Sequence, residues 1–364
     1  AVSGRVKWKR FYKPKGYGSA QGTQVAVDPL GNVYVLGVAF NASSGRDYIL
    51  IKYSAGGRKK WAKRVSANVL DEDAQPALAV GTNSYLLGIR KKRTGSREHI
   101  IVKHDSRGRR KWTRRIGHDG SSDFFERSGS IGVDQNENAY AAIYKGGNYV
   151  TVKYGSGGRR KWVRRYDGPG NGDDEPSDLL VDKGGNVYVT GASQGPSGDR
   201  FSFGFATIKY DSGGNLLWVR RYKDAARDMS MASKLALDRN GNLFVGGANW
   251  AFDAVFWENI IIKYNKGGDK VWLRRNRKIL SLKDLATDNA GDVIVSGDGF
   301  STSTERSFSA TTKYSSSGKR LWTRTYRDRS FRTNAMAASP KGTVFVTGPD
   351  QGNKLDFATI RYAP

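Results

Sequence analysis

Residues 205–222 read FATIKYDSGGNLLWVRRY, and this stretch decides the fold. Two runs rich in β-branched and aromatic residues flank the turn sequence DSGGN (211–215), which predicts two antiparallel strands joined by a tight hairpin. The tryptophan of this stretch recurs at intervals of 50 to 56 residues, as Trp8, Trp61, Trp112, Trp162, Trp218, Trp272 and Trp322. A fixed period of this length indicates a repeat architecture.

Two further motifs recur with the same period. A short apolar–Lys/Arg–aromatic motif precedes the glycine-rich turn in each copy, except that Thr312 replaces the apolar residue in one copy; it spans 51–53, 102–104, 152–154, 208–210, 262–264, 312–314 and 360–362. An Asp-x-x-Gly-Asn or closely related turn leads into alternating apolar residues at 28–37, 182–191, 238–247 and 288–297. Together the motifs predict a four-stranded unit, with strands near 177–182, 186–191, 204–210 and 216–222 in the fourth copy. We call them strands a to d.

The order of the motifs predicts how the repeat closes. The chain begins with a lone Trp8 strand and ends with a lone strand at 360–362, so each supplies what the other lacks. We therefore expect an all-β fold, a seven-bladed β-propeller with four antiparallel strands per blade, as a single domain over residues 1–364. Its seventh blade would combine about residues 1–12, as strand d, with residues 333–364.

The motifs resemble the bacterial β-propeller repeat (SBBP) family. The resemblance is carried by residues 205–222, by the YDGPGNGDD stretch at 166–174 and by GNVYVTG at 185–191, and it covers essentially the whole chain. It implies a β-propeller in an exported or surface-associated bacterial protein, without a single activity common to the family. Function has to be argued from the residues themselves.

Composition excludes several classes of protein. The 364 residues contain no Cys, which removes disulfides, thiol nucleophiles and cysteine-based metal sites. No apolar run approaches the roughly 18 residues of a membrane-spanning helix. The start at Ala1, without an apolar leader, favours an exported and processed protein, although a trimmed chain would look the same. No catalytic residues, cofactor or metal site are predicted: the acids near Asp174 fit a turn better than a calcium loop, and His104 fits a packing role.

The net charge of +27 is concentrated in particular places. Every copy has a basic residue two places after its tryptophan (Arg10, Lys63, Arg114, Arg164, Arg220, Arg274, Arg324), for which we expect a structural role. The c–d hairpins of three consecutive units carry a second set, at Arg58, Lys59, Lys60, Arg107, Arg109, Arg110, Lys111, Arg159, Arg160 and Lys161. This second set predicts a surface that binds an anionic partner: an acidic protein, a cell-surface glycan or lipopolysaccharide, in a larger extracellular assembly.

An irregular segment in the fifth unit suggests a second contact surface. It holds two extra tryptophans and two phenylalanines (Trp250, Phe252, Phe256, Trp257). Exposed aromatic clusters often mark interfaces or sugar platforms. The alternative is that Phe256 and Trp257 simply begin strand c and pack between blades.

Two other functions remain open alternatives. A glycan lyase or hydrolase would need loop carboxylates, for which the candidates are Asp73, Asp123, Asp174 and Asp228. Nucleic-acid binding would satisfy the same electrostatics, but no nucleic-acid-binding motif is present. The interpretation favoured by the sequence is an exported, non-enzymatic binding or structural module.

Overall fold

The computed structural model is built from strands. It describes residues 8, 10–41, 45–69, 76–92, 94, 96–117, 129–196, 202–225, 229–251, 254–301, 306–326, 333, 335–338, 344–350 and 356–362. These residues form 27 strands and no helix, which confirms the all-β class. Accordingly, no helix in the described part of the chain is long and apolar enough to cross a membrane.

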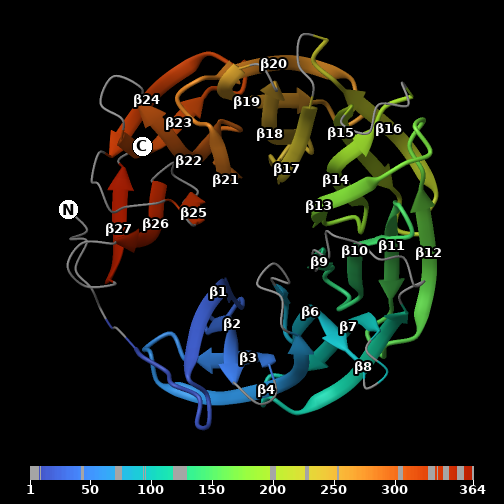
Figure 1. Cartoon of the computed structure of the whole chain (residues 1–364), viewed down its shortest axis with the longest axis vertical. Helices are drawn as coiled ribbons and strands as arrows, with labels where there is room; N and C mark the ends of the chain where they lie inside the picture. The colour runs from blue at the N-terminus through green and yellow to red at the C-terminus, as the bar shows by residue number, and fades with distance from the viewer. Residues whose placement is uncertain are drawn as a thin grey trace. The chain divides into compact units, whose positions relative to one another are not determined.

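Two compact units divide the chain. The first contains Ala1–Asp167, Asp173–Val189 and Tyr210–Asn215, and the second contains Gly168–Gly172, Thr190–Lys209 and Leu216–Pro364. Three four-stranded antiparallel sheets belong to the first unit (Figure 1). Their strands are β1 (Ser19–Val27), β2 (Val33–Asn41), β3 (Gly45–Tyr53) and β4 (Lys59–Val69); β5 (Ala77–Val80), β6 (Ser84–Lys91), β7 (Arg97–His104) and β8 (Arg110–Gly117); and β9 (Ser130–Val133), β10 (Ala139–Lys145), β11 (Asn148–Tyr154) and β12 (Arg160–Tyr166).

The remaining strands repeat the same order along the chain. They are β13 (Asp174–Val181), β14 (Val187–Gln194), β15 (Phe203–Tyr210) and β16 (Leu216–Tyr222); β17 (Met229–Leu237), β18 (Leu243–Ala251), β19 (Ala254–Tyr264) and β20 (Lys270–Asn276); β21 (Ser281–Thr287), β22 (Val293–Ser301), β23 (Arg306–Tyr314) and β24 (Arg320–Tyr326); and β25 (Ala335–Ala338), β26 (Val344–Asp350) and β27 (Asp356–Tyr362). Strands β13–β20 join in one eight-stranded sheet, β21–β24 form a four-stranded sheet, and β25–β27 form a three-stranded sheet.

The aspartate turns have the chemistry that the sequence indicates. In the first copy, Asp28 Oδ1 accepts hydrogen bonds from the backbone N–H groups of Leu30 (3.0 Å) and Asn32 (2.8 Å). Gly31 sits between them at φ +76°, a conformation that an L side chain rarely adopts. The carboxylate therefore completes the turn that joins β1 to β2.

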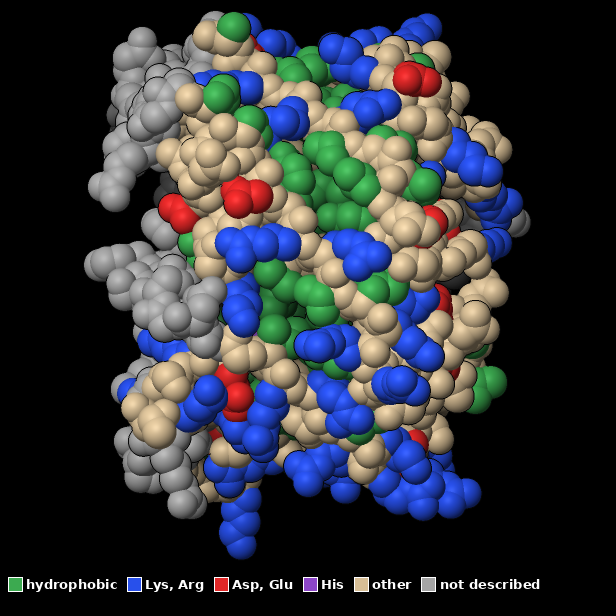
Figure 2. All heavy atoms as spheres, turned by 90° about the vertical axis from the view of Figure 1, so that its right-hand side faces the viewer, with side chains coloured by type: hydrophobic (Ala, Val, Ile, Leu, Met, Phe, Trp, Pro, Cys, Tyr) green, Lys and Arg blue, Asp and Glu red, His purple; other side chains and the backbone are tan. Residues whose placement is uncertain are grey.

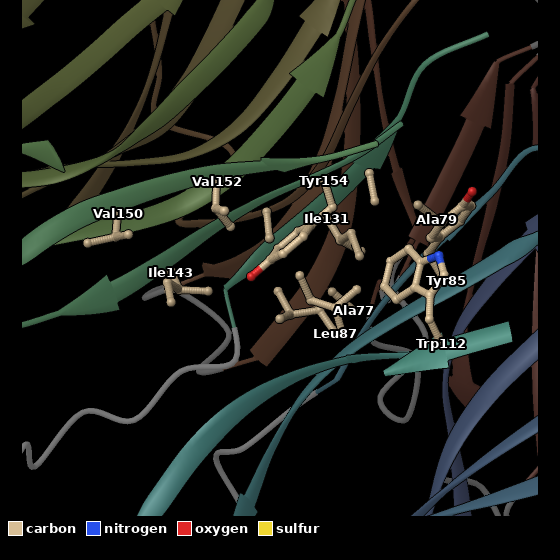
Figure 3. Close-up of a cluster of buried hydrophobic side chains, with 13 residues drawn as sticks. Ala77, Ala79, Tyr85, Leu87, Trp112, Ile131, Ile143, Val150, Val152 and Tyr154 are labelled. Atoms are coloured by element: carbon tan, nitrogen blue, oxygen red, sulfur yellow. The ribbon is translucent and has the colours of Figure 1, made fainter. Parts of the chain in front are cut away.

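The core lies between successive sheets. One cluster combines Tyr85 and Leu87 of β6 and Trp112 of β8 with Val152 and Tyr154 of β11, all less than a tenth exposed (Figure 3). The indole of Trp112 lies 5.9 Å from the Tyr85 ring and 6.2 Å from the Tyr154 ring, so it packs against its own sheet and the next one. The repeated tryptophan therefore joins neighbouring sheets.

The structure describes only part of the two segments that are predicted to close the repeat. Sheet β25–β27 has three strands, as expected for a unit that lacks its own strand d. Residues 1–7 and 9 of the segment predicted to supply that strand lie outside the described residues, and Trp8 and residues 10–12 are not in a strand. The closure and the blade number remain predictions.

Candidate anion-binding surface

Five of the seven repeated tryptophans (Trp8, Trp61, Trp112, Trp162 and Trp272) donate a hydrogen bond to the hairpin of a following sheet. The indole Nε1–H of Trp112 donates to the carbonyl oxygen of Ser156 (3.0 Å), and Lys103 Nζ donates to the same oxygen (2.9 Å). The ammonium of Lys103 also lies 5.0 Å from the centroid of the Tyr85 ring. The same pair of donors meets one carbonyl oxygen for Lys52 and Trp61, Lys153 and Trp162, and Lys263 and Trp272. These lysines therefore help to hold one sheet to the next. We call this set of contacts between the tryptophan, its neighbouring cations and the next hairpin the joint between two sheets.

The arginine two residues after the tryptophan completes the joint. Arg164 Nε donates to the carbonyl oxygen of Gly214 (2.5 Å), and its guanidinium lies 5.8 Å from the Trp162 ring centroid. The corresponding bonds to the hairpin glycine are made by Arg10, Arg114, Arg220 and Arg274. The structural role expected for this repeated position therefore matches these contacts.

The cations of the three c–d hairpins differ from these repeated cations in their exposure and contacts. All ten side chains predicted as binding residues, from Arg58 to Lys161, are exposed in the turns β3–β4, β7–β8 and β11–β12 or at the first residues of β4, β8 and β12. Among them, Arg109 pairs with the carboxylate of Asp105 (2.7 Å) and Lys59 lies 5.0 Å from the Tyr12 ring. The other eight make no ion pair with the described residues. Figure 2 shows one face of the molecule, where Lys and Arg side chains far outnumber Asp and Glu.

Two grooves lie between these sheets, and both have cationic linings. One, of about 620 Å³, is lined by β4, the ends of β6 and β7, and the start of β8 (Lys63, Arg64, Val65, Ser66, Arg90, Ile100, Val102, His104, Gly108, Arg109, Arg110 and Thr113). The other, of about 500 Å³, occupies the corresponding place one sheet further, where Arg114, Arg115, Arg159 and Arg160 line it with Tyr154. The basic surface is therefore hollowed rather than flat.

His104 is the buried titratable group of the larger groove. Burial, together with the positive charges of Lys63 and Arg110, lowers the pKa of His104 to about 4, although Asp105 opposes this shift. The residue is 3% exposed, and Nδ1 of its imidazole is buried without a hydrogen bond to the described residues. The ring is neutral at pH 7. It also packs against the Trp61 ring at 6.5 Å, which agrees with the packing role expected from the sequence.

The other candidates from the sequence lie elsewhere. Trp250 lies in β18 opposite Met229, and the backbone of Phe256 and Trp257 belongs to β19, the strand c of this copy. Phe252 lies outside the described residues. Of the candidate carboxylates, Asp174 is fully buried in β13, and Asp73, Asp123 and Asp228 lie outside the described residues. In the described part of the chain, no group of three His, Asp or Glu side chains is placed to hold a metal ion.

Sequence reasoning missed several residues of the larger groove. Arg90 has no counterpart in the repeat, and the position of Thr113 varies between copies, so periodicity does not single them out. Arg64 stands at a position that is Arg in five of the seven copies, and that recurrence does not mark it as part of a groove. Lys63 and His104 carry a visible signal: they are the places where the repeated arginine and tyrosine are replaced. That signal becomes informative only when the structure places both in one groove.

Solved structures of known proteins share this arrangement of sheets. No protein-family model and no curated protein matches the chain. The β-propeller domain of the Trilobed protease from Pyrococcus furiosus, which has an open velcro topology, is 8% identical, with a TM-score of 0.56 over 94% of this chain and 93% of that one. The polysaccharide lyase Uly1 is 12% identical, with a TM-score of 0.53 over 99% and 92% of the two chains.

A third similar structure is the acylaminoacyl peptidase of Pyrococcus horikoshii, at 9% identity and a TM-score of 0.53. The match covers 96% of this chain and 53% of that one. At these identities the likeness concerns the fold and not the activity. The repeated antiparallel sheets and these neighbours together support a fold of β-propeller type.

Proposed function

We propose that this chain is an exported, non-enzymatic β-propeller of the bacterial repeat type that binds an anionic macromolecule through the hairpins β3–β4, β7–β8 and β11–β12. The observation that carries the proposal is the contrast between two sets of cations. The repeated lysines and arginines are engaged with carbonyl oxygens and aromatic rings of the fold. Eight of the ten hairpin cations are exposed and have neither an ion pair nor a stacked ring among the residues that the structure describes.

Electrostatics explains why this contrast matters. A cluster of unpaired cations attracts a polyanion over several ångströms and accelerates its association, and the attraction weakens as salt rises. In the second unit, the corresponding hairpins β19–β20 and β23–β24 carry fewer cations, namely Lys266, Lys270, Lys319 and Arg320. The excess in the first unit supports a specific surface rather than a general effect of net charge.

The partner is an anionic glycan, a lipopolysaccharide or an acidic protein. The resemblance to an exported repeat family favours these over nucleic acid. The grooves between the hairpins are depressions in this surface, and a linear polymer can lie along them. Heparin, polyglutamate and duplex DNA serve as probes for an anionic glycan, an acidic protein and a nucleic acid, compared at one ionic strength.

The experiment compares two variants with the same change in charge. The first replaces Arg110, Lys111, Arg160 and Lys161 by Gln, and the matched control replaces Lys266, Lys270, Lys319 and Arg320 by Gln. We expect heparin affinity at physiological salt to fall at least about tenfold in the first variant and to change little in the control. Equal losses would mean that net charge alone is responsible, and the proposal would then fail. Tighter binding of DNA than of heparin at that salt would favour the nucleic-acid alternative.

We also propose that the sheets form seven blades, closed by the N-terminal segment. Trp8 Nε1–H donates to the carbonyl oxygen of Ala55 (3.0 Å), and Arg10 Nε donates to that of Gly57 (2.8 Å). The same two bonds to the next hairpin are made by Trp112 and Arg114, by Trp162 and Arg164, and by Trp272 and Arg274. The three-stranded sheet β25–β27 then supplies the remaining strands of the last blade.

A further inference from the structure

One joint between sheets departs from the repeat at two positions. Arg occupies the position two places after Trp in six of the seven copies, and Tyr ends the apolar–basic–aromatic motif in six of the seven. The exceptions are Lys63 and His104. They come from different copies of the repeat and more than 40 residues apart, yet both line the larger groove between sheets β1–β4 and β5–β8.

The next joint shows what the usual residues do. Arg114 Nε donates to the carbonyl oxygen of Gly158 (2.5 Å), and the guanidinium lies 5.5 Å from the ring centroid of Trp112. Tyr154 packs against that indole. The guanidinium of Arg114 is therefore fixed in position by the hairpin carbonyl and the indole.

At the joint that contains Lys63 and His104, the positive charge is not held by such contacts. The stem of Lys63 covers Gly108 as the arginine covers its glycine elsewhere, but the ammonium makes no hydrogen bond or ion pair with the described residues. A lysine lacks the planar fork that lets Arg stack on Trp and bond the carbonyl oxygen at once. The side chain of Lys63 is exposed, so its charge faces the groove and solvent.

The balance of charge in this groove is positive. Among the described residues, five cations line it and no carboxylate does. Arg64 pairs with Asp47 (2.6 Å), Arg90 with Glu98, and Arg109 with Asp105 (2.7 Å). Lys63 and Arg110 have no ion pair within the described part of the chain, so the described lining presents two uncompensated positive charges.

Three buried polar atoms in the lining have no hydrogen-bond partner among the described residues. They are Nδ1 of His104, Oγ1 of Thr113 and Nε of Arg90. Such atoms are costly to a fold, and they commonly mark a place where a ligand or water supplies the missing partner. They include donors for an oxygen-rich ligand, and the imidazole of His104 is itself more than nine-tenths buried.

We propose that the groove between β4 and β7–β8 binds one doubly charged tetrahedral oxyanion, a free sulfate or phosphate or a phosphate monoester, through Lys63, Arg110, His104 and Thr113. Two uncompensated cations match its charge, and its several oxygens match the unpartnered donors. The inference deepens the proposed function, since such a group carried by the anionic partner would occupy the groove.

The test uses the full chain and inorganic sulfate as the probe, with sodium chloride of equal ionic strength as the reference. Binding is followed by NMR of the histidine ring protons, which are few because the chain has three histidines. The His104 signal is assigned by its loss in His104→Tyr. We expect sulfate to shift it saturably in the low millimolar range or below, and chloride to leave it unshifted. Inorganic phosphate and glucose 6-phosphate then show whether a free ion or an ester fits.

The decisive variant is Lys63→Arg, which restores the residue of the other six copies and is therefore expected to fold. The new guanidinium should bond the Gly108 carbonyl and stack on Trp61, so that sulfate affinity falls at least about tenfold. The matched control is Lys319→Arg, the same exchange in an exposed hairpin position of the second unit, and it should leave sulfate binding unchanged.

Three outcomes separate this inference from the proposed function. A sulfate response that is absent, equalled by chloride, or unchanged in Lys63→Arg overturns the groove site, even if heparin still depends on the hairpin cations. A sulfate site that responds to Lys63→Arg supports it, even if heparin does not bind. A glucose 6-phosphate response without a sulfate response would mean that the groove recognises the sugar rather than the oxyanion, which also overturns the inference.

Discussion

The side chain of Arg164 is held by three contacts at once. It donates to the carbonyl oxygens of Gly214 (2.5 Å) and Val163 (2.8 Å), and it lies over the ring of Trp162. A guanidinium so arranged contributes packing and hydrogen bonding more than free charge. The neighbouring Lys161 is exposed and makes no ion pair with the described residues. Two cations three residues apart thus have opposite roles.

This difference predicts that two substitutions change the free energy of unfolding by unequal amounts. Arg164→Ala should lower the free energy of unfolding by about 2 kcal/mol, because it removes hydrogen bonds to carbonyl oxygens and the contact with Trp162. Lys161→Ala should change it by less than about 0.5 kcal/mol. Urea unfolding monitored by tryptophan fluorescence measures both. Similar losses of unfolding free energy in the two variants would contradict the different roles assigned to Arg164 and Lys161.

The burial of His104 predicts a pH dependence of stability. Its pKa in the folded chain, about 4, lies below the ordinary histidine value of about 6.5, so the unfolded chain takes up a proton that the folded chain refuses. Stability from this group is therefore present above pH 6.5 and is lost as the pH falls toward 4, by about 2–3 kcal/mol. His104→Tyr should lack that part of the decline in urea unfolding between pH 7 and 4.5. Parallel curves for the two proteins would contradict the assignment.

Sulfate should oppose this effect. The charged groups around the imidazole are Lys63 on β4, Arg110 on β8, and Arg109 and Asp105 in the turn between β7 and β8. A bound dianion counteracts the cations and raises the pKa of His104, so sulfate affinity should increase as the pH falls from 7 to 5. Sulfate keeps its charge across this range, unlike phosphate. Calorimetric titration at several pH values checks the direction, and an affinity that falls with acidity would refute it.

At the scale of strands and turns, local sequence predicts much of the structure. The fourth copy was expected to form strands near 177–182, 186–191, 204–210 and 216–222, and it forms β13 to β16 at closely similar positions. Alternating β-branched residues and the glycine-containing turns act within a few residues of one another, so one sequence suffices to find them.

Contacts between sheets are harder to predict. Glu137 takes φ +61° where other copies have Gly, and its carboxylate accepts hydrogen bonds from the Thr82 N–H, the Asn83 amide and the Tyr85 hydroxyl (2.6–2.8 Å). It thereby joins sheets β5–β8 and β9–β12. In the sequence, Glu137 is only a departure from the turn motif, but in the structure it connects two sheets. The larger groove was missed for the same reason, because its lining comes from segments distant in sequence.

The N-terminal segment gives a prediction at the same scale. Deleting residues 1–11 removes Trp8 and Arg10 from the hairpin at 54–58, and it should lower the melting temperature clearly, since a packed indole and two hydrogen bonds are lost. Deleting residues 1–6 keeps both side chains and serves as the matched control. Circular dichroism melting compares the two. An unchanged melting curve after the longer deletion would be incompatible with the proposed closure.

For the whole molecule, the hairpin cations predict how binding depends on salt. Each cation–anion contact releases about 0.7–0.9 of a counterion, so the slope of log affinity against log salt reports the number of contacts. Replacing Arg110, Lys111, Arg160 and Lys161 by Gln should reduce that slope for heparin by up to about 3. Affinity chromatography or calorimetry between 50 and 300 mM salt, roughly the range where screening changes most, measures it. A slope that does not change would show that these side chains do not touch the polymer.

The joint between sheets also bears on how such a chain can change in length. In the joint at Trp112, the tryptophan, arginine and lysine donors belong to one period of the sequence, and the carbonyl oxygens that accept from them belong to the next. Backbone carbonyls are present whatever the side chains are. Duplication or loss of one whole period by recombination therefore leaves every remaining joint intact, and no compensating substitution is needed. A joint with Lys63 and His104 can in turn diverge toward a ligand without disturbing its neighbours.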